Sequence, residues 1–87
     1  MTFRITSTAV DGGTLLRIEG RLTRDGVAEL VRACEGAARP LTIDLSELRL
    51  TDEAAVAALA GLEKSGATLV GASQYLELRL KPWRQRA

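Results

Sequence analysis

Residues 41–53 read LTIDLSELRLTDE, and this stretch carries the strongest structural signal in the chain. Apolar and polar residues alternate over residues 41–45, which is typical of a strand with one buried face. We expect a loop over residues 46–50 and then a helix over residues 52–65, with Thr51 as its N-cap. The apolar residues of that helix recur at helical spacing and predict a buried side made of Ala55, Val56, Leu59 and Leu62.

The residues before this stretch predict two strands and a helix. Residues 3–10 begin with apolar–polar alternation and are rich in β-branched side chains, and Asp11-Gly12-Gly13 tolerates positive φ, so we expect a tight hairpin whose second strand ends at Gly20. A helix is expected over residues 24–35, with Thr23 as its N-cap. The apolar residues of this helix form one stripe, which consists of Val27, Leu30, Val31 and Cys34. Because Cys34 lies on this stripe, we expect it to be a core residue rather than a nucleophile.

After the second helix, the chain predicts one more strand and one ambiguous segment. Gly66 ends the helix, and residues 68–70 have the composition of a short strand. Residues 75–81 fit two structures, because Leu76, Leu78 and Leu80 alternate as in a strand while Leu76, Leu80 and Trp83 are spaced as in a helix. Pro82 is unfavourable in the interior of a helix and of a strand, so it does not decide between the two structures.

The expected order of elements is therefore β-β-α-β-α-β. Strands joined through helices run parallel with right-handed crossovers, and the first hairpin adds an antiparallel edge. We predict one α/β domain over residues 1–81, with a mixed four-stranded sheet, an antiparallel N-terminal hairpin and helices mainly on one face of the sheet. Residues 82–87 are expected to form a short basic tail.

The composition narrows the classes of function. The chain has 87 residues, one cysteine and no histidine, so histidine-dependent triads, histidine metal sites and internal disulfides are excluded. The acidic residues near the loop and second helix, Asp44, Glu47, Asp52 and Glu53, follow no metal-loop spacing, and we expect no cofactor or metal. A mildly acidic body and the absence of a long apolar run favour a cytoplasmic protein without nucleic-acid binding or membrane insertion.

Short motifs in this order resemble the STAS domain family (sulfate transporter and anti-sigma factor antagonist). In that family a strand ending in Asp-Leu-Ser, here Asp44-Leu45-Ser46, leads through a short loop to an Asp that opens a helix, here Asp52. Gly20-Arg21-Leu22 resembles the Gly-x-Leu that follows the second strand of the family. Residues 66–69 with Ser73 resemble its last strand and the start of its final helix.

The resemblance implies a non-enzymatic regulatory module that binds other proteins, as an anti-sigma factor antagonist does in bacterial signalling. In switchable members of the family, a kinase phosphorylates the hydroxyl residue just after the Asp. This chain carries Glu53 at that position, followed by Ala54 and Ala55, so the usual phosphoacceptor is absent. We expect Asp52 and Glu53, with Thr51 and Ser46 in the adjoining loop, to form a partner-docking surface or a degenerate phospho-switch.

Alternatives remain open from the sequence. Thr51, Asp52 and Glu53 also make a good N-cap and first turn for any helix, and Thr51 could be a displaced phosphoacceptor. The partner could be an anti-sigma kinase, another STAS protein, or the ATPase of an ABC-type transporter on which the domain acts as an accessory subunit. A third possibility is that the chain is an interaction module in an assembly and has no switching role. The edge of the first strand and the early end of the chain also favour a homodimer.

Overall fold

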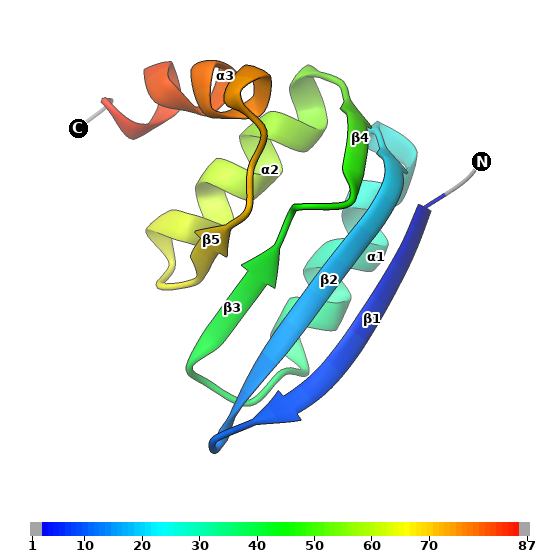
Figure 1. Cartoon of the computed structure of the whole chain (residues 1–87), viewed down its shortest axis with the longest axis vertical. Helices are drawn as coiled ribbons and strands as arrows, with labels where there is room; N and C mark the ends of the chain where they lie inside the picture. The colour runs from blue at the N-terminus through cyan, green and yellow to red at the C-terminus, as the bar shows by residue number, and fades with distance from the viewer. Residues whose placement is uncertain (1–2, 86–87) are drawn as a thin grey trace.

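The computed structural model describes residues 3–85, which form five strands and three helices (Figure 1). In chain order these are β1 (Phe3–Val10), β2 (Gly13–Leu22), α1 (Arg24–Glu35), β3 (Leu41–Asp44), β4 (Leu48–Thr51), α2 (Glu53–Lys64), β5 (Thr68–Val70) and α3 (Gln74–Arg84).

The strands form one mixed sheet in the order β1-β2-β3-β5, and β4 pairs with β2 beyond the end of β3. β1 and β2 are antiparallel, whereas β2–β3, β2–β4 and β3–β5 are parallel. This confirms the predicted α/β class, the mixed sheet and the N-terminal hairpin. The hairpin is closed by Asp11 and Gly12, both with positive φ (44° and 83°), as the type I′ turn between two twisted strands requires.

The prediction of a four-stranded sheet with a loop over residues 46–50 was wrong in one respect, because β4 adds a fifth strand. The second strand does not end at Gly20 but continues to Leu22, and its last residues pair with β4. The register shifts between Gly20 and Arg21, and Gly20 has a φ of 91°. This bulge lets a single long strand pair with β3 along one part and with β4 along the next.

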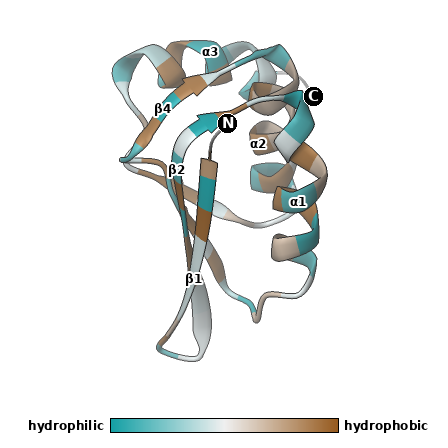
Figure 2. Ribbon diagram, turned by 90° about the vertical axis from the view of Figure 1, so that its right-hand side faces the viewer, coloured by the Kyte–Doolittle hydropathy of each residue, from teal (hydrophilic) through white to brown (hydrophobic). Residues whose placement is uncertain are grey.

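α1 and α2 lie on the same face of the sheet, as Figure 2 shows, and the core fills the space between the two layers. Cys34 is buried in this core as predicted. The core side chains are almost all aliphatic and come from every helix, from β2 and β3, and from Leu45 directly after β3: Leu16, Ile18, Leu22, Leu30, Leu41, Ile43, Leu45, Val56, Leu59, Leu76 and Leu80.

The ambiguous segment 75–81 is helical and belongs to α3. Ser73 caps this helix, since its Oγ accepts a hydrogen bond from the backbone N–H of Leu76 at 3.1 Å. Leu76 and Leu80 are buried, whereas Leu78 is 62% exposed, which is the pattern of a helix rather than of a strand. Pro82 lies inside the last turn, and Arg84 ends the helix, so α3 extends into the segment that we expected to be a tail.

No helix among residues 3–85 is both long and apolar enough to cross a membrane.

The helical assignment of α3 predicts unequal effects of two leucine truncations. Leu80→Ala should lower the free energy of unfolding by about 2–5 kcal/mol, because it removes a fully buried side chain. Leu78→Ala, two residues away on the exposed side, should change it by less than about 0.5 kcal/mol. Urea unfolding followed by circular dichroism measures both values, and equal losses would contradict the helix.

Candidate functional site

The predicted site residues Thr51, Asp52 and Glu53 form the junction between β4 and α2. Thr51 is the last residue of β4, Asp52 is the N-cap and Glu53 is the first residue of α2. The prediction of Thr51 as N-cap was therefore wrong by one residue. Either side chain can cap a helix, but pairing of β4 with β2 keeps Thr51 in the strand, where it lies opposite Leu22.

The Asp52 carboxylate binds the first turns of two helices at once. Its Oδ1 accepts a hydrogen bond from the backbone N–H of Ala55 at 2.9 Å, which caps α2. Its Oδ2 accepts one from the backbone N–H of Arg24 at 3.0 Å, at the start of α1. Thr23 is the N-cap of α1 by position, as predicted, but its side chain makes no capping hydrogen bond. Asp52 thus supplies from another element the acceptor that we expected from Thr23.

These hydrogen bonds lower the pKa of Asp52 below its ordinary value, the bond from Arg24 contributing most and that from Ala55 next. Hydrogen bonds donated to a carboxylate favour its charged form. The partial positive charge at the N-termini of α1 and α2 acts in the same direction.

Glu53 forms an ion pair with Arg79 of α3. The same guanidinium donates a hydrogen bond to the hydroxyl of Tyr75 at 2.7 Å and lies 5.7 Å from the centre of the Tyr75 ring. The Glu53 side chain remains 69% exposed, so the pair sits at the surface where α3 meets the start of α2. The negative charge at this position is therefore balanced within the chain.

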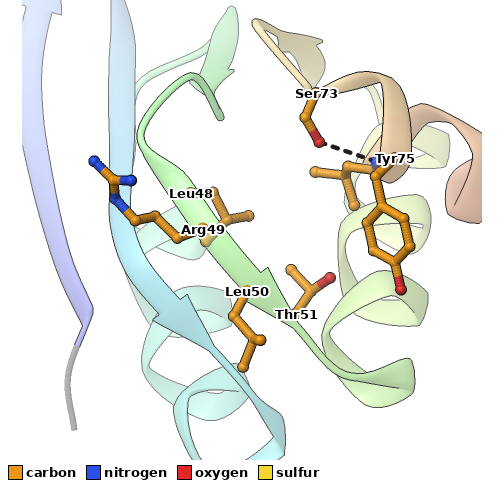
Figure 3. A pocket seen from close by; sticks show the side chains of 7 residues that line it. Leu48, Arg49, Leu50, Thr51, Ser73 and Tyr75 are labelled. Atoms are coloured by element: carbon orange, nitrogen blue, oxygen red, sulfur yellow. Dashed lines mark hydrogen bonds between the residues drawn. The ribbon is translucent and has the colours of Figure 1, made fainter.

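A groove of about 190 Å³ separates β4 from α3, beside the junction (Figure 3). We call it the β4–α3 groove, and its lining residues are Leu48, Arg49, Leu50, Thr51, Ser73, Tyr75 and Leu76. Thr51 points toward Tyr75 across it, while Arg49 points to the other side of β4. The groove exists because β5 is only three residues long and pairs with β3 alone, leaving the outer edge of β4 without a strand among residues 3–85.

Three large apolar side chains are exposed on the two elements that border this groove. Leu50 on β4 is 50% exposed, and Tyr75 and Leu78 on α3 are 61% and 62% exposed. Tyr75, Leu78 and Arg79 are spaced i, i+3 and i+4 and so share one face of the helix. Exposed apolar side chains that gather beside a groove and a charged pair are typical of protein-binding surfaces.

Ser46 lies apart from this group. It is in the turn after β3, where its backbone N–H donates to Asp44 Oδ1 at 2.9 Å, and it does not line the groove. The turn packs against Gly71, since a Cβ added there would lie 3.0 Å from Asp44 Oδ1 and 3.1 Å from the Ser46 nitrogen. The structure thus brings Thr51, Asp52 and Glu53 together with α3 and leaves Ser46 beyond the end of the groove.

The described residues offer little for covalent or metal chemistry. Residues 3–85 contain no group of three or more histidine, cysteine, aspartate or glutamate side chains that could hold a metal ion. Burial raises the pKa of the Cys34 thiol, which disfavours the reactive thiolate.

Sequence reasoning missed Leu50, Tyr75, Leu78 and Arg79 as residues of the site. The sequence predicts a loop at residue 50, and the other three residues lie in the segment 75–81, which fits both a strand and a helix. A helical reading of residues 75–81 places Tyr75, Leu78 and Arg79 on one face, away from Leu76 and Leu80, and that signal was available.

One family model matches most of this chain, and several solved structures resemble its fold. The family model described as "Mlab, STAS domain" matches residues 5–75. The crystal structure of an antisigma-factor antagonist STAS domain from Rhodobacter sphaeroides is 28% identical, with a TM-score of 0.63 over 83% of this chain and 92% of that chain. The anti-sigma factor antagonist SpoIIAA in its unphosphorylated form is 18% identical, with a TM-score of 0.66 over 92% of this chain and 82% of that chain.

A third structure shares the fold. It is an uncharacterised protein of the DUF3478 family from Shewanella loihica, with a SpoIIAA-like fold, 18% identity and a TM-score of 0.53 over 94% of this chain and 78% of that chain. Among curated protein sequences, none matches this chain.

The double contact of Asp52 predicts a large effect on stability. Asp52→Ala should lower the melting temperature more than Glu53→Ala does, because it removes an acceptor from both α1 and α2, whereas Glu53 makes one exposed ion pair. Thermal unfolding followed by circular dichroism measures both. Equal melting temperatures of the two variants would contradict the role of Asp52.

The lowered pKa of Asp52 predicts part of the acid sensitivity of the protein. The stability that the ionised carboxylate contributes is fully present above its ordinary pKa of 3.8 and is lost as the pH falls through the lower folded-state value. Asp52→Asn, which cannot titrate, should be less stable than wild type at neutral pH and lose less stability between about pH 4 and pH 2. Asp11→Asn serves as the control, because Asp11 makes no hydrogen bond or ion pair among residues 3–85. An acid profile of Asp52→Asn as steep as wild type would refute the assignment.

Proposed function

The chain belongs to the STAS domain family, and from this membership we propose that it is a non-enzymatic regulatory module that docks on a protein partner, as an anti-sigma factor antagonist does. The proposed setting is transcription regulation in the bacterial cytoplasm. The proposed docking surface is the β4–α2 junction with the face of α3 beside it. The partner is an anti-sigma kinase or another STAS protein.

The observation that carries the proposal is the gathering of exposed apolar side chains around the β4–α2 junction. Leu50, Tyr75 and Leu78 offer apolar area to a partner, and Asp52 holds the start of α2 in place behind them. Tyrosine is enriched among the residues that supply most of the binding energy of an interface, and apolar neighbours such as leucine exclude water around them, while charged pairs at the rim contribute mainly to specificity. Thr51 lines the groove beside these side chains, whereas Ser46 lies outside the groove and is not part of the proposed surface.

Glu53 is proposed to stand where switchable relatives carry the phosphoacceptor. A phosphate carries about −1.5 to −2 charges at pH 7, whereas Glu53 carries a single charge that Arg79 already balances. The residue therefore imitates neither the free hydroxyl nor the full phosphate. We propose that the docking surface does not switch between two forms and keeps one charge state, in which Glu53 of α2 pairs with Arg79 of α3.

A second candidate function is an accessory subunit that docks on the ATPase of an ABC-type transporter. The observation that favours it is the same ion pair, because constitutive docking needs no hydroxyl to modify and gains from a fixed surface. The two candidates use the same surface and differ in the partner.

An affinity experiment with matched baits tests both candidates. Wild type, Glu53→Ser, Glu53→Lys and Glu35→Ser are compared as baits in extract from the native host, with the captured proteins quantified by mass spectrometry. Glu35 is an exposed acid at the far end of α1, so Glu35→Ser controls for loss of a negative charge. We expect a kinase-type anti-sigma factor or a STAS protein to be captured by wild type and Glu35→Ser and reduced several-fold with Glu53→Lys.

The identity of the captured protein separates the two candidates. Equal capture of a transport ATPase by wild type and Glu53→Ser would assign the protein to the accessory class. Capture that does not differ among all four baits would remove the β4–α2 junction from the docking surface.

A further inference from the structure

β1 occupies one edge of the sheet, on the opposite side of β2 from β4. One side of β1 pairs with β2 along its whole length, from Phe3 opposite Gly20 to Val10 opposite Gly13. Among residues 3–85, no strand pairs with its other side (Figure 1). The strand is eight residues long, whereas β5 at the opposite edge has three.

The hairpin turn determines which backbone groups of β1 face outward. In a hairpin closed by a two-residue turn, the residues that flank the turn form a hydrogen-bonded pair, and such pairs then alternate along the strands. Val10, Thr8 and Thr6 therefore exchange hydrogen bonds with β2. The backbone N–H and C=O groups of Ala9, Ser7 and Ile5 point away from the sheet and are available to another strand.

This edge lacks the features that prevent strand pairing in other proteins. Residues 5–10 read ITSTAV and contain no charge, no proline and no glycine. The pairing of β1 with β2 is continuous, without a bulge that would twist the edge away. Natural edge strands are usually short or carry a lysine, a proline or a bulge. β1 combines an uncharged stretch with full length, which favours a partner strand.

The charges at the two ends of β1 fit a second copy in the antiparallel direction. Arg4 lies near the start of the strand and Asp11 directly after its end, and neither makes an ion pair among residues 3–85. With Ser7 on a two-fold axis, Arg4 of one copy lies opposite Val10 and next to Asp11 of the other, and the arrangement occurs twice. Thr6 then faces Thr8 across the interface, a favourable pair of β-branched residues. A parallel arrangement would instead bring the like charges together.

We propose that two copies of this chain associate through antiparallel pairing of their β1 strands, centred near Ser7, so that one sheet continues through both copies. The β4–α3 groove lies beyond β2 and stays open in each copy. This association is independent of the docking function proposed above, and it would present two docking surfaces on one particle. A partner with two binding sites would then bind with increased avidity.

The molar mass in solution tests the proposal. Light scattering after gel filtration should give a mass that rises from 9.3 kDa toward twice that value as the concentration increases from about 10 μM to about 1 mM. Ser7→Pro removes an outward N–H but no hydrogen bond to β2, and Ser7→Lys places two ammonium groups opposite each other at the axis. Both variants should remain at 9.3 kDa. Thr68→Lys places the same charge on the opposite edge strand and should associate like wild type.

Amide hydrogen exchange supplies a readout that does not depend on a variant folding. In the wild type, exchange at Ile5, Ser7 and Ala9 should slow at least several-fold at the higher concentration, while Thr6 and Thr8 are protected at both concentrations. A mass of 9.3 kDa at every concentration would overturn the proposal. So would a dimer that the folded Ser7 variants retain, or one that leaves exchange at these three amides unchanged.

Discussion

The Asp52 carboxylate is the contact on which the arrangement of the site depends. The first turn of every helix presents backbone N–H groups without internal partners, and α1 and α2 both begin at the same end of the domain. One carboxylate accepts from Arg24 of α1 and from Ala55 of α2, and its negative charge also offsets the positive ends of the two helix dipoles. The direction in which α2 leaves β4 follows from this contact. So does the position of Glu53, whose carboxylate contacts Arg79 of α3.

α3 completes the surface that the junction begins. Leu76 and Leu80 attach it to the core, and the ion pair between Glu53 and Arg79 attaches its outer side to α2. The exposed pair contributes little to stability, so the buried leucines supply most of the attachment of α3. Burial of Leu76 and Leu80 leaves Tyr75 and Leu78 exposed on the other side of α3, where Arg79 contacts Glu53. The charged and apolar parts of the surface therefore depend on one helix.

Local patterns predicted most of the fold, because alternation and helical spacing are properties of neighbouring residues. The hairpin, both long helices and the strand over residues 68–70 were predicted in this way. β4 was missed because Leu48 to Thr51 is a strand only by virtue of pairing with a part of β2 far away in the chain. The Glu53–Arg79 contact joins residues that are 26 positions apart, and the pairing of charges across such a separation has no local signature. The N-cap was placed one residue early because Thr51 and Asp52 are equally suitable caps by residue type.

The position of Trp83 gives the protein a natural optical label. It is the only tryptophan in the chain, and it packs half-buried against the core from the last turns of α3, next to Ala60 and Lys64 of α2. Indole emission moves to longer wavelength when the ring passes from an apolar environment into water. The wavelength of maximum emission therefore reports whether α3 is packed against α2. The state of the helix that carries Tyr75, Leu78 and Arg79 can be followed without attaching a dye or altering a residue.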